Sequence, residues 1–253
     1  MRVLLQDVSH TYRGREGRRV EALAGVTFAV ESEEIVAVVG PSGCGKSTLL
    51  NMLGGLLSPT EGRVGFEGDL PSGRPPTAMV FQEFALFPWK TVAGNVAWGL
   101  EAQGIEKEKV AETVQAYLEL MDLAQFRNHY PAEISGGMKQ RVALARVLAF
   151  NPKVLLMDEP FGALDAQTRE TMQEEVTRIW ERTHKTIVFV THDIEEAVFL
   201  GDRVIVLSAR PGRIREDIRI ELPRPRTLEI KKSAQCHQYR NTIWDLIRRE
   251  SRS

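Results

Sequence analysis

The sequence predicts an α/β fold with a mostly parallel β-sheet at its core. Three short apolar runs, Ile35–Val39, Val154–Met157 and Thr186–Val190, have the continuous apolar character of strands buried on both faces. Segments with helical patterning separate these runs, and strands that alternate with helices are typical of parallel sheets. The 253-residue chain is 43% hydrophobic and 26% charged, which is the composition of a globular protein and excludes a disordered one.

The first run leads into a glycine-rich stretch, GPSGCGKST, that matches the phosphate-loop pattern G-x-x-x-x-G-K-[ST] at every fixed position. A helix is expected to begin at Ser47, and backbone N–H groups at a helix N-terminus attract phosphate. Lys46 would add a charge for the outer phosphates, and Ser47 an oxygen ligand for Mg²⁺. The alternative, a glycine-rich turn without a ligand, is disfavoured by the flanking strand and helix. The expected nucleotide contacts are Gly40, Pro41, Ser42, Gly43, Cys44, Gly45, Lys46, Ser47 and Thr48.

Two strands are expected before this loop, Val3–Val8 and Val20–Val30, joined by the charged loop Arg13–Arg19. They would form a small antiparallel layer beside the nucleotide. Tyr12 follows the first strand, where its ring could stack on a purine. Half-buried packing is the more common role of such a tyrosine, and both interpretations stay open.

After the loop helix, the sequence predicts a turn, a strand at Arg63–Gly68 and a proline-rich connection, PSGRPPT, to a strand at Ala78–Phe81. That strand is followed by Gln82. Ligands in parallel sheets gather at the carboxyl ends of the strands. The Gln82 amide could therefore reach the metal ion or the water beside a bound nucleotide.

The stretch from about residue 83 to 150 has the composition of an inserted helical lobe. Its expected helices are Val92–Ala102, Lys107–Met121 and Met138–Ala149.

Three aromatic residues, Phe84, Phe87 and Trp89, open this lobe in a segment that Pro88 keeps from being a regular helix. If they are exposed, they mark a docking surface. If they are buried, they are local core, and the residues alone leave this choice open.

Later in the lobe, Ser135 is a candidate N-cap, and Gly136 and Gly137 open the first turn of the next helix. Bare N–H groups at such a helix start can bind an anion. A helix start with a tight backbone contact and no ligand is an equally good interpretation of these residues.

The apolar run that ends at Met157 is followed by two carboxylates, Asp158 and Glu159. Beside a phosphate loop, Asp158 could hold Mg²⁺ and Glu159 could orient and deprotonate the attacking water. An Asp-Glu pair can also be a solvated loop, but its place after an apolar strand favours function. His192 follows the third run, and at the same sheet edge it could bind a γ-phosphate.

The rest of the chain is predicted to contain a helix at Glu170–Arg182, a hairpin of Val204–Ser208 and Ile214–Ile220 around the turn ARPG, a linker at Leu222–Arg226, and a short final helix at Thr242–Glu250. From Arg203 onward the chain carries 13 Lys+Arg against 6 Asp+Glu. This basic segment could lie near an anionic membrane surface or a partner, although a solvated face is the more common explanation.

Two cysteines, Cys44 and Cys236, and the lack of a signal-like start indicate a reducing compartment, most simply the cytoplasm. Apolar runs such as Leu49–Leu57 are broken by polar and glycine residues, so no membrane-spanning helix is expected. Near-neutral net charge argues against nucleic acid as the main partner.

With these motifs in order, the sequence resembles the ATP-binding subunits of ATP-binding-cassette (ABC) transporters. The resemblance covers roughly Val3–Ile220. It assigns Tyr12 to the adenine-stacking aromatic, GPSGCGKST to the phosphate loop, Gln82 to the Q-loop, ISGGMKQR to the signature, VLLMDEP to the strand with the Mg²⁺-site Asp158 and the catalytic Glu159, GALD with Asp165 to the D-loop, and His192 to the switch histidine. The signature departs from the common form in its first residue and in Met138, but it keeps Ser135 and Gly137.

The resemblance implies a P-loop ATPase of ABC type that uses ATP and Mg²⁺, with a nucleotide-binding domain at 1–222, a helical subdomain at about 83–150, and a C-terminal extension at 223–253. It also implies a head-to-tail homodimer that binds membrane permease subunits, and through them a periplasmic or extracellular solute-binding protein, at the cytoplasmic face of the cell membrane. The segment ALFPWKTVAGNVAWGLE and the SARPGRI hairpin look like those of nitrate, sulfonate and taurine importers.

Two other functions fit the sequence less well than transport. Soluble ABC-type ATPases of nucleic-acid repair or translation resemble proteins with long insertions or tandem cassettes, and neither fits in 253 residues. A non-catalytic scaffold should lack the base, and Glu159 is present. We also expect Cys44, at a helix N-terminus, to have a lowered pKa, to react with alkylating reagents and to be protected by MgATP.

Overall fold

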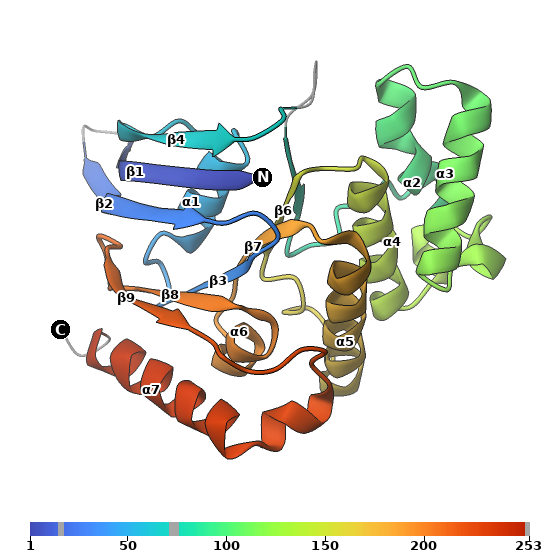
Figure 1. The fold of residues 1–253 in the computed structure, drawn as a ribbon. Helices are drawn as coiled ribbons and strands as arrows, with labels where there is room; N and C mark the ends of the chain where they lie inside the picture. Colours follow the sequence, from blue (N-terminus) through green and yellow to red (C-terminus); the bar gives the residue numbers. More distant parts are fainter. Residues whose placement is uncertain (15–17, 71–75, 251–253) are drawn as a thin grey trace.

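The computed structural model describes residues 1–14, 18–70 and 76–250. Part of the charged loop at 13–19 and most of the proline-rich connection at 71–77 lie outside these ranges. Two β-sheets and seven α-helices occupy the described part of the chain (Figure 1).

The larger sheet has six strands. In sheet order they are Thr77–Val80 (β5), Val154–Asp158 (β6), Thr186–Val190 (β7), Ile35–Val39 (β3), Arg203–Leu207 (β8) and Ile214–Arg219 (β9). The first five run parallel to their neighbours, and β9 runs antiparallel to β8. The prediction of a mostly parallel sheet is confirmed, and two of its strands, β3 and β7, have the predicted bounds.

The smaller sheet has three antiparallel strands in the order β2-β1-β4. They are Arg2–Arg13 (β1), Arg19–Val30 (β2) and Glu61–Glu67 (β4), so the first strand is longer than expected. Helix α1, Lys46–Leu53, follows β3, and its Leu49 and Leu50 belong to the hydrophobic cluster that joins the two sheets. The predicted antiparallel layer is therefore present and packs against the helix that begins in the phosphate loop.

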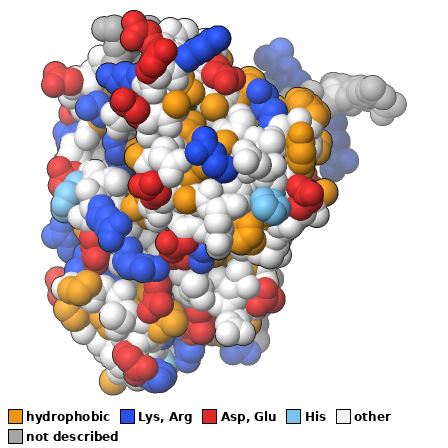
Figure 2. Space-filling view, turned by 90° about the vertical axis from the view of Figure 1, so that its right-hand side faces the viewer, with side chains coloured by type: hydrophobic (Ala, Val, Ile, Leu, Met, Phe, Trp, Pro, Cys, Tyr) orange, Lys and Arg blue, Asp and Glu red, His pale blue; other side chains and the backbone are white. Residues whose placement is uncertain are grey.

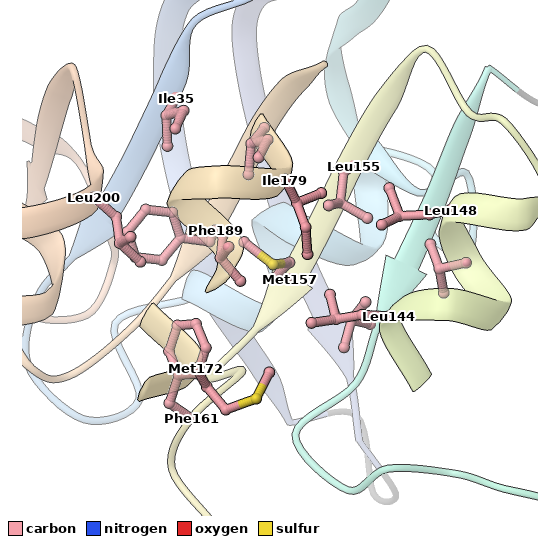
Figure 3. Close-up of a cluster of buried hydrophobic side chains, with 14 of the residues drawn as sticks. Ile35, Leu144, Leu148, Leu155, Met157, Phe161, Met172, Ile179, Phe189 and Leu200 are labelled. Atoms are coloured by element: carbon pink, nitrogen blue, oxygen red, sulfur yellow. The ribbon is translucent and has the colours of Figure 1, made fainter. Parts of the chain in front are cut away.

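Side chains of the central strands alternate between two hydrophobic clusters, because successive residues of a strand point to opposite faces. In β7, Val188 and Val190 face the α1 side, while Ile187 and Phe189 face the opposite side. On that opposite side, Phe189 meets Met157 and residues from later helices, as Figure 3 shows. Burial on both faces explains why these strands read as continuous apolar runs.

Six further helices follow α1 in the described part of the chain. They are Val92–Ala102 (α2), Lys107–Leu120 (α3), Gly136–Ala149 (α4), Ala166–Thr183 (α5), Ile194–Leu200 (α6) and Ala234–Glu250 (α7). Short 3₁₀ turns occur at Ala124–Phe126, Pro131–Glu133 and Leu228–Lys232. In residues 1–14, 18–70 and 76–250, no helix combines the length and the apolar character that a membrane span requires.

Helices α4 and α5 begin earlier than predicted, at Gly136 and Ala166, and two other helices differ more from the sequence-based expectation. Helix α6 was not expected, because its sequence, IEEAVFL, is almost entirely buried and shows no helical alternation of apolar and polar residues. Helix α7 begins at Ala234, before the predicted start at Thr242. The sequence did not indicate its first turns because they lack an apolar stripe: only Cys236 and Ile243 are buried along the helix.

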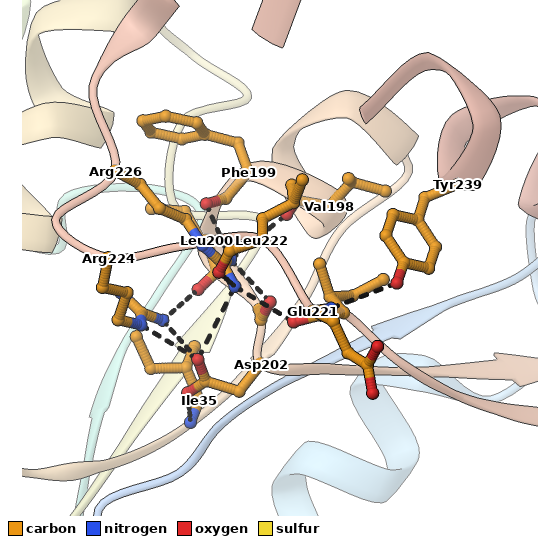
Figure 4. Close-up of polar contacts among 12 residues, drawn as sticks. Ile35, Val198, Phe199, Leu200, Asp202, Glu221, Leu222, Arg224, Arg226 and Tyr239 are labelled. Atoms are coloured by element: carbon orange, nitrogen blue, oxygen red, sulfur yellow. Dashed lines mark hydrogen bonds and ion pairs between the residues drawn. The ribbon is translucent and has the colours of Figure 1, made fainter. Parts of the chain in front are cut away.

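The segment predicted as a linker, Leu222–Arg226, is irregular but packed. The Arg226 side chain donates to the carbonyls of Val198, Phe199 and Gly201 at 2.7–3.3 Å, and so binds the C-terminal end of α6 (Figure 4). Arg224 forms an ion pair with Asp202 at 2.7 Å. Burial, with Arg224 adding to it, lowers the pKa of Arg226 to about 10.

Candidate active site

The predicted polar residues gather at one edge of the large sheet. Gln82 follows β5, Asp158 and Glu159 stand at the end of β6, His192 follows β7, and the phosphate loop follows β3. These strands are parallel, so their carboxyl ends lie at the same edge. The topology therefore assembles residues that are more than 100 positions apart in the sequence.

A pocket of about 580 Å³ opens at this edge. Nine of the residues that line it were predicted as site residues: Tyr12, Ser42, Gly43, Gly45, Lys46, Ser47, Thr48, Glu159 and His192. Val20, Ala22 and Arg210 also line it and were not predicted. The pocket is thus formed by the phosphate loop, the antiparallel layer and the sheet edge together.

The phosphate loop is held by its own backbone and by Lys46. Gly45 has φ 102°, and a Cβ at this position would lie 2.8 Å from the Ala22 carbonyl oxygen, so the loop needs glycine there. The Lys46 ammonium donates to the carbonyl oxygens of Gly40 at 2.9 Å and Pro41 at 3.2 Å. These contacts hold the Lys46 ammonium beside the loop, at the N-terminus of helix α1.

Ser47 and Asp158 bring two side-chain oxygens together. The Ser47 hydroxyl donates to Oδ1 of Asp158 at 3.2 Å, from the first turn of α1 to the end of β6. Burial raises the pKa of Asp158, the bond from Ser47 lowers it, and Glu159 raises it. Mg²⁺ is usually held by one or two protein oxygens plus phosphates and water, and this pair fits that requirement.

Glu159 lies at the centre of a second polar group. Its Oε2 atom lies 3.0 Å from Nδ1 of His192 and accepts a hydrogen bond from Nε2 of Gln82 at 3.3 Å. The Glu159 backbone N–H donates to the Val190 carbonyl at 2.9 Å, which ties the end of β6 to the end of β7. The structure therefore brings the three predicted catalytic residues onto one carboxylate oxygen.

Tyr12 contacts both helix α1 and strand β1. Its hydroxyl lies 3.1 Å from Oγ1 of Thr48, and its ring meets His10 edge to face at 4.6 Å between centroids. The residue is 43% exposed and lines the pocket. An aromatic face is thus available to a base, while one edge of the ring packs on the protein.

The signature residues lie apart from this pocket. Ser135 caps α4 by accepting from the Met138 backbone N–H at 3.3 Å, and with Gly137 it lines a separate pocket of about 270 Å³. Gly136 is exposed beside them. Asp165 caps α5, where hydrogen bonds from Thr168 lower its pKa. The structure does not bring Ser135, Gly136, Gly137 or Asp165 to the phosphate loop of the same chain.

The expectation of a lowered pKa at Cys44 is wrong. The side chain is 1% exposed, and burial raises the pKa of its thiol despite the nearby Lys46. The thiol points into the cluster between the two sheets and away from solvent. The helix N-terminus is a weaker influence here than desolvation.

Comparison with known proteins agrees with this geometry. The chain matches the ABC transporter family over residues 23–162. It is 46% identical to the nitrate import ATP-binding protein NrtD of Synechocystis sp., over 98% of this chain and 96% of the relative. It is 45% identical to the aliphatic sulfonates import ATP-binding protein SsuB of Bacillus cereus, over 90% of this chain and 89% of the relative.

A solved structure is also similar. It is the dimeric post-hydrolysis state of the ATP-binding cassette MJ0796 bound to ADP and Pi, with a TM-score of 0.73 and 34% identity, over 87% of this chain and 100% of the other. The family match covers more than half of the chain, and the pocket contains the phosphate loop and the carboxylate expected of an ATPase. The chain therefore belongs to the ABC transporter family and is an ATPase of that family.

Proposed function

We propose that this ATPase powers solute import through a membrane permease, and that the solute is a small anion such as nitrate, a sulfonate or taurine. Relatives named for nitrate and sulfonate import match 98% and 90% of this chain, beyond residues 23–162, which match the family. The catalytic part of this proposal rests on one structural observation. His192 and Gln82 both contact Oε2 of Glu159 beside the phosphate loop.

In the proposed mechanism, Glu159 takes the proton of the attacking water. Gln82 and His192, which bind its Oε2 atom in this structure, position the water and contact the γ-phosphate. Lys46 would exchange its contacts with the Gly40 and Pro41 carbonyls for the outer phosphates. Mg²⁺, held by Ser47 and Asp158, with Gln82 beside it, would neutralise part of the phosphate charge.

The site is proposed to be completed by a second copy of the chain. Ser135 and Gly137 line a pocket separate from the phosphate loop, so one chain carries two incomplete halves. A head-to-tail pair would bring Ser135, Gly136, Gly137 and Asp165 of one chain to the phosphate loop of the other. The dimeric form of the related cassette supports the pairing of two chains.

The permease is proposed to dock on the surface around Trp89. Trp89 is 72% exposed, and its ring contacts Phe87 at 5.6 Å between centroids, while Phe84 packs on the core. Figure 2 looks onto the side on which α2 and α3 lie and shows hydrophobic side chains at its surface among charged ones. The aromatic segment begins two residues after Gln82, so docking there could affect the active site directly.

We further propose the division of the chain into a nucleotide-binding domain at 1–222, with a helical subdomain at about 83–150, and an extension at 223–253. Through the permease, the protein would lie at the cytoplasmic face of the membrane, and a solute-binding protein would act on it only indirectly.

Purification from detergent-solubilised membranes tests the import proposal. We expect a multi-span permease to co-purify with the tagged chain, and the reconstituted complex to hydrolyse ATP faster with nitrate or a sulfonate, presented with the cognate solute-binding protein. A chain that hydrolyses ATP but recovers no membrane protein would contradict the transport role and leave the ATPase assignment intact.

A further inference from the structure

The turn after β8, which belongs to the SARPGRI hairpin, reaches the pocket that the phosphate loop lines. Four of the five parallel strands end at residues already placed in the site. The fifth, β8, runs parallel to β3 and leads to Arg210, which lines the same pocket as the phosphate loop. Arg210 therefore stands at the sheet edge where ligands of parallel sheets bind.

The backbone of this turn is fixed against the phosphate loop. Gly212 donates to the Ala22 carbonyl at 2.9 Å and accepts from the Ala24 N–H at 3.1 Å. A Cβ on Gly212 would lie 2.1 Å from the Cys44 carbonyl oxygen, so the two backbones are in direct contact. Glu250, at the end of α7, accepts from the Ala209 N–H at 3.4 Å. Arg210 thus lies in a turn that is hydrogen-bonded to β2 and packed on the phosphate loop.

The Arg210 side chain lies over the loop itself. Its Nε donates to the Gly43 carbonyl at 3.1 Å, and Nη2 lies 2.9 Å from the position that a Cβ on Gly43 would take. In the part of the chain that the structure describes, no carboxylate pairs with Arg210. One of its five N–H donors is used at Gly43, and the residue is otherwise exposed at the pocket.

We propose that Arg210 is a nucleotide-binding residue whose guanidinium contacts the phosphates of ATP. The phosphates are favoured over the base, because the Arg210 guanidinium donates to the carbonyl of Gly43, a glycine in the middle of the phosphate loop. A planar guanidinium next to such a loop can bind phosphate oxygens through two parallel hydrogen bonds. This inference rests on ATP binding alone and not on the import proposal.

The competing explanation is that Arg210 only holds the phosphate loop in shape through Gly43. The two roles differ in what they predict for the ligand-free protein. A residue that only binds phosphate can be replaced without loss of stability in the ligand-free protein. A residue that holds the loop should stabilise the protein even when no nucleotide is bound.

The test uses the full-length isolated chain and measures the dissociation constants of ATP and of pyrophosphate by calorimetry. Arg210→Ala should weaken both by about tenfold or more, because hydrogen bonds between charged groups are strong. Arg210→Lys keeps the charge but not the planar guanidinium, so it should lose less affinity for both ligands. Arg213→Ala is the matched control, since this arginine follows the same turn but lies towards Gly25 and does not line the pocket.

Thermal unfolding of the ligand-free variants separates the two explanations. An unchanged midpoint for Arg210→Ala, with weaker binding of ATP and pyrophosphate, supports the proposal. Affinities within about twofold of the wild type would overturn it. A midpoint lower by several degrees, with Arg210→Lys binding as poorly as Arg210→Ala, would also overturn it and assign Arg210 to the loop's structure. None of these measurements needs the permease, so the import proposal is tested separately.

Discussion

The ring nitrogen Nδ1 of His192 lies 3.0 Å from Oε2 of Glu159. This contact joins the ends of two neighbouring parallel strands, and it holds the proposed base in place before substrate binds. The same oxygen accepts from Gln82, so a residue that precedes the aromatic segment is one hydrogen bond away from the base. Movement of that segment would therefore change the partners of Glu159 directly.

Replacing Glu159 with Gln should abolish turnover without abolishing ATP binding. The amide keeps the size of the side chain but cannot accept the proton of water, so the rate should fall at least about 100-fold. ATPase activity and ATP affinity are measured in parallel, with Glu112→Gln on the exposed face of α3 as the control. Rapid hydrolysis by Glu159→Gln would remove Glu159 from the role of base.

Mixed dimers test whether each site is shared between chains. Lys46→Ala and Ser135→Arg chains should each be inactive alone. If sites are shared, a mixed dimer contains one doubly damaged site and one intact site, so mixing should restore part of the ATPase activity. A mixture that stays inactive, together with no disulfide between Ser42→Cys and Gly136→Cys chains in ATP-bound Glu159→Gln protein, would contradict the head-to-tail arrangement.

Trp89→Ala should separate ATP hydrolysis from transport. The side chain is 72% exposed, so its loss should leave the isolated subunit folded and active while it weakens recovery of the permease. Trp244→Ala is the control for loss of an exposed tryptophan, because Trp244 is 58% exposed on α7; it lines a pocket with His192, so ATPase activity is measured for both variants. Equal permease recovery with both variants would show that Trp89 is not part of the docking surface.

Alkylation of native protein should be slow at both cysteines. Cys44 and Cys236 are each 1% exposed, and burial raises the pKa of each thiol, so little reactive thiolate is available. Mass spectrometry after iodoacetamide treatment should detect labelling chiefly in denatured protein. Fast labelling of Cys44 in the native chain, with MgATP protecting it, would show that the phosphate loop opens readily.

The buried carboxyl of Glu196 should make folding stability depend on pH. Burial first, and then Asp193, raises its pKa from 4.5 to about 8, while hydrogen bonding from Thr191 and the charge of Arg169 oppose the shift. The folded protein therefore holds a proton that the unfolded chain releases. This contribution to stability is complete below pH 4.5 and is lost as the pH rises towards 8.

Glu196→Gln should remove this dependence, because the amide does not titrate. Its unfolding free energy relative to the wild type should rise between pH 5 and pH 8, by at most about 1.4 kcal/mol per pH unit. Urea denaturation at several pH values measures the difference, and exposed Glu112→Gln serves again as the control. Parallel pH profiles for Glu196→Gln and the wild type would mean that Glu196 is ionised in the folded protein.

The apolar runs and the motifs of the sequence predicted the fold and most of the site. Strands buried on both faces are continuous apolar runs, which is why β3 and β7 were placed at their observed bounds. The phosphate loop and the carboxylates that follow β6 were recognisable because their chemistry requires fixed residue types in sequence. Their meeting at one edge followed from the parallel topology, which the alternation of strands and helices indicated.

Features that depend on contacts between distant segments were not predictable in this way. Helix α6 is enclosed by strands and by α7, so its sequence carries no amphipathic period. Arg210 sits in an ordinary hairpin turn, and only the contact of that turn with Cys44 and Gly43 reveals its place beside the phosphate loop. The raised pKa of Cys44 is not predictable either, because the sequence shows the helix N-terminus but not the burial of the thiol.

Arg226 determines where this ATPase can be joined to another protein. A fusion or exchange made at the prolines around Arg224 would look safe from the sequence, since it falls after the last recognised motif. It would, however, remove the guanidinium that binds the carbonyls of Val198, Phe199 and Gly201 and leave them buried without a donor. Chimeras of related cassettes should therefore take the segment through Arg226 from the same parent as helix α6.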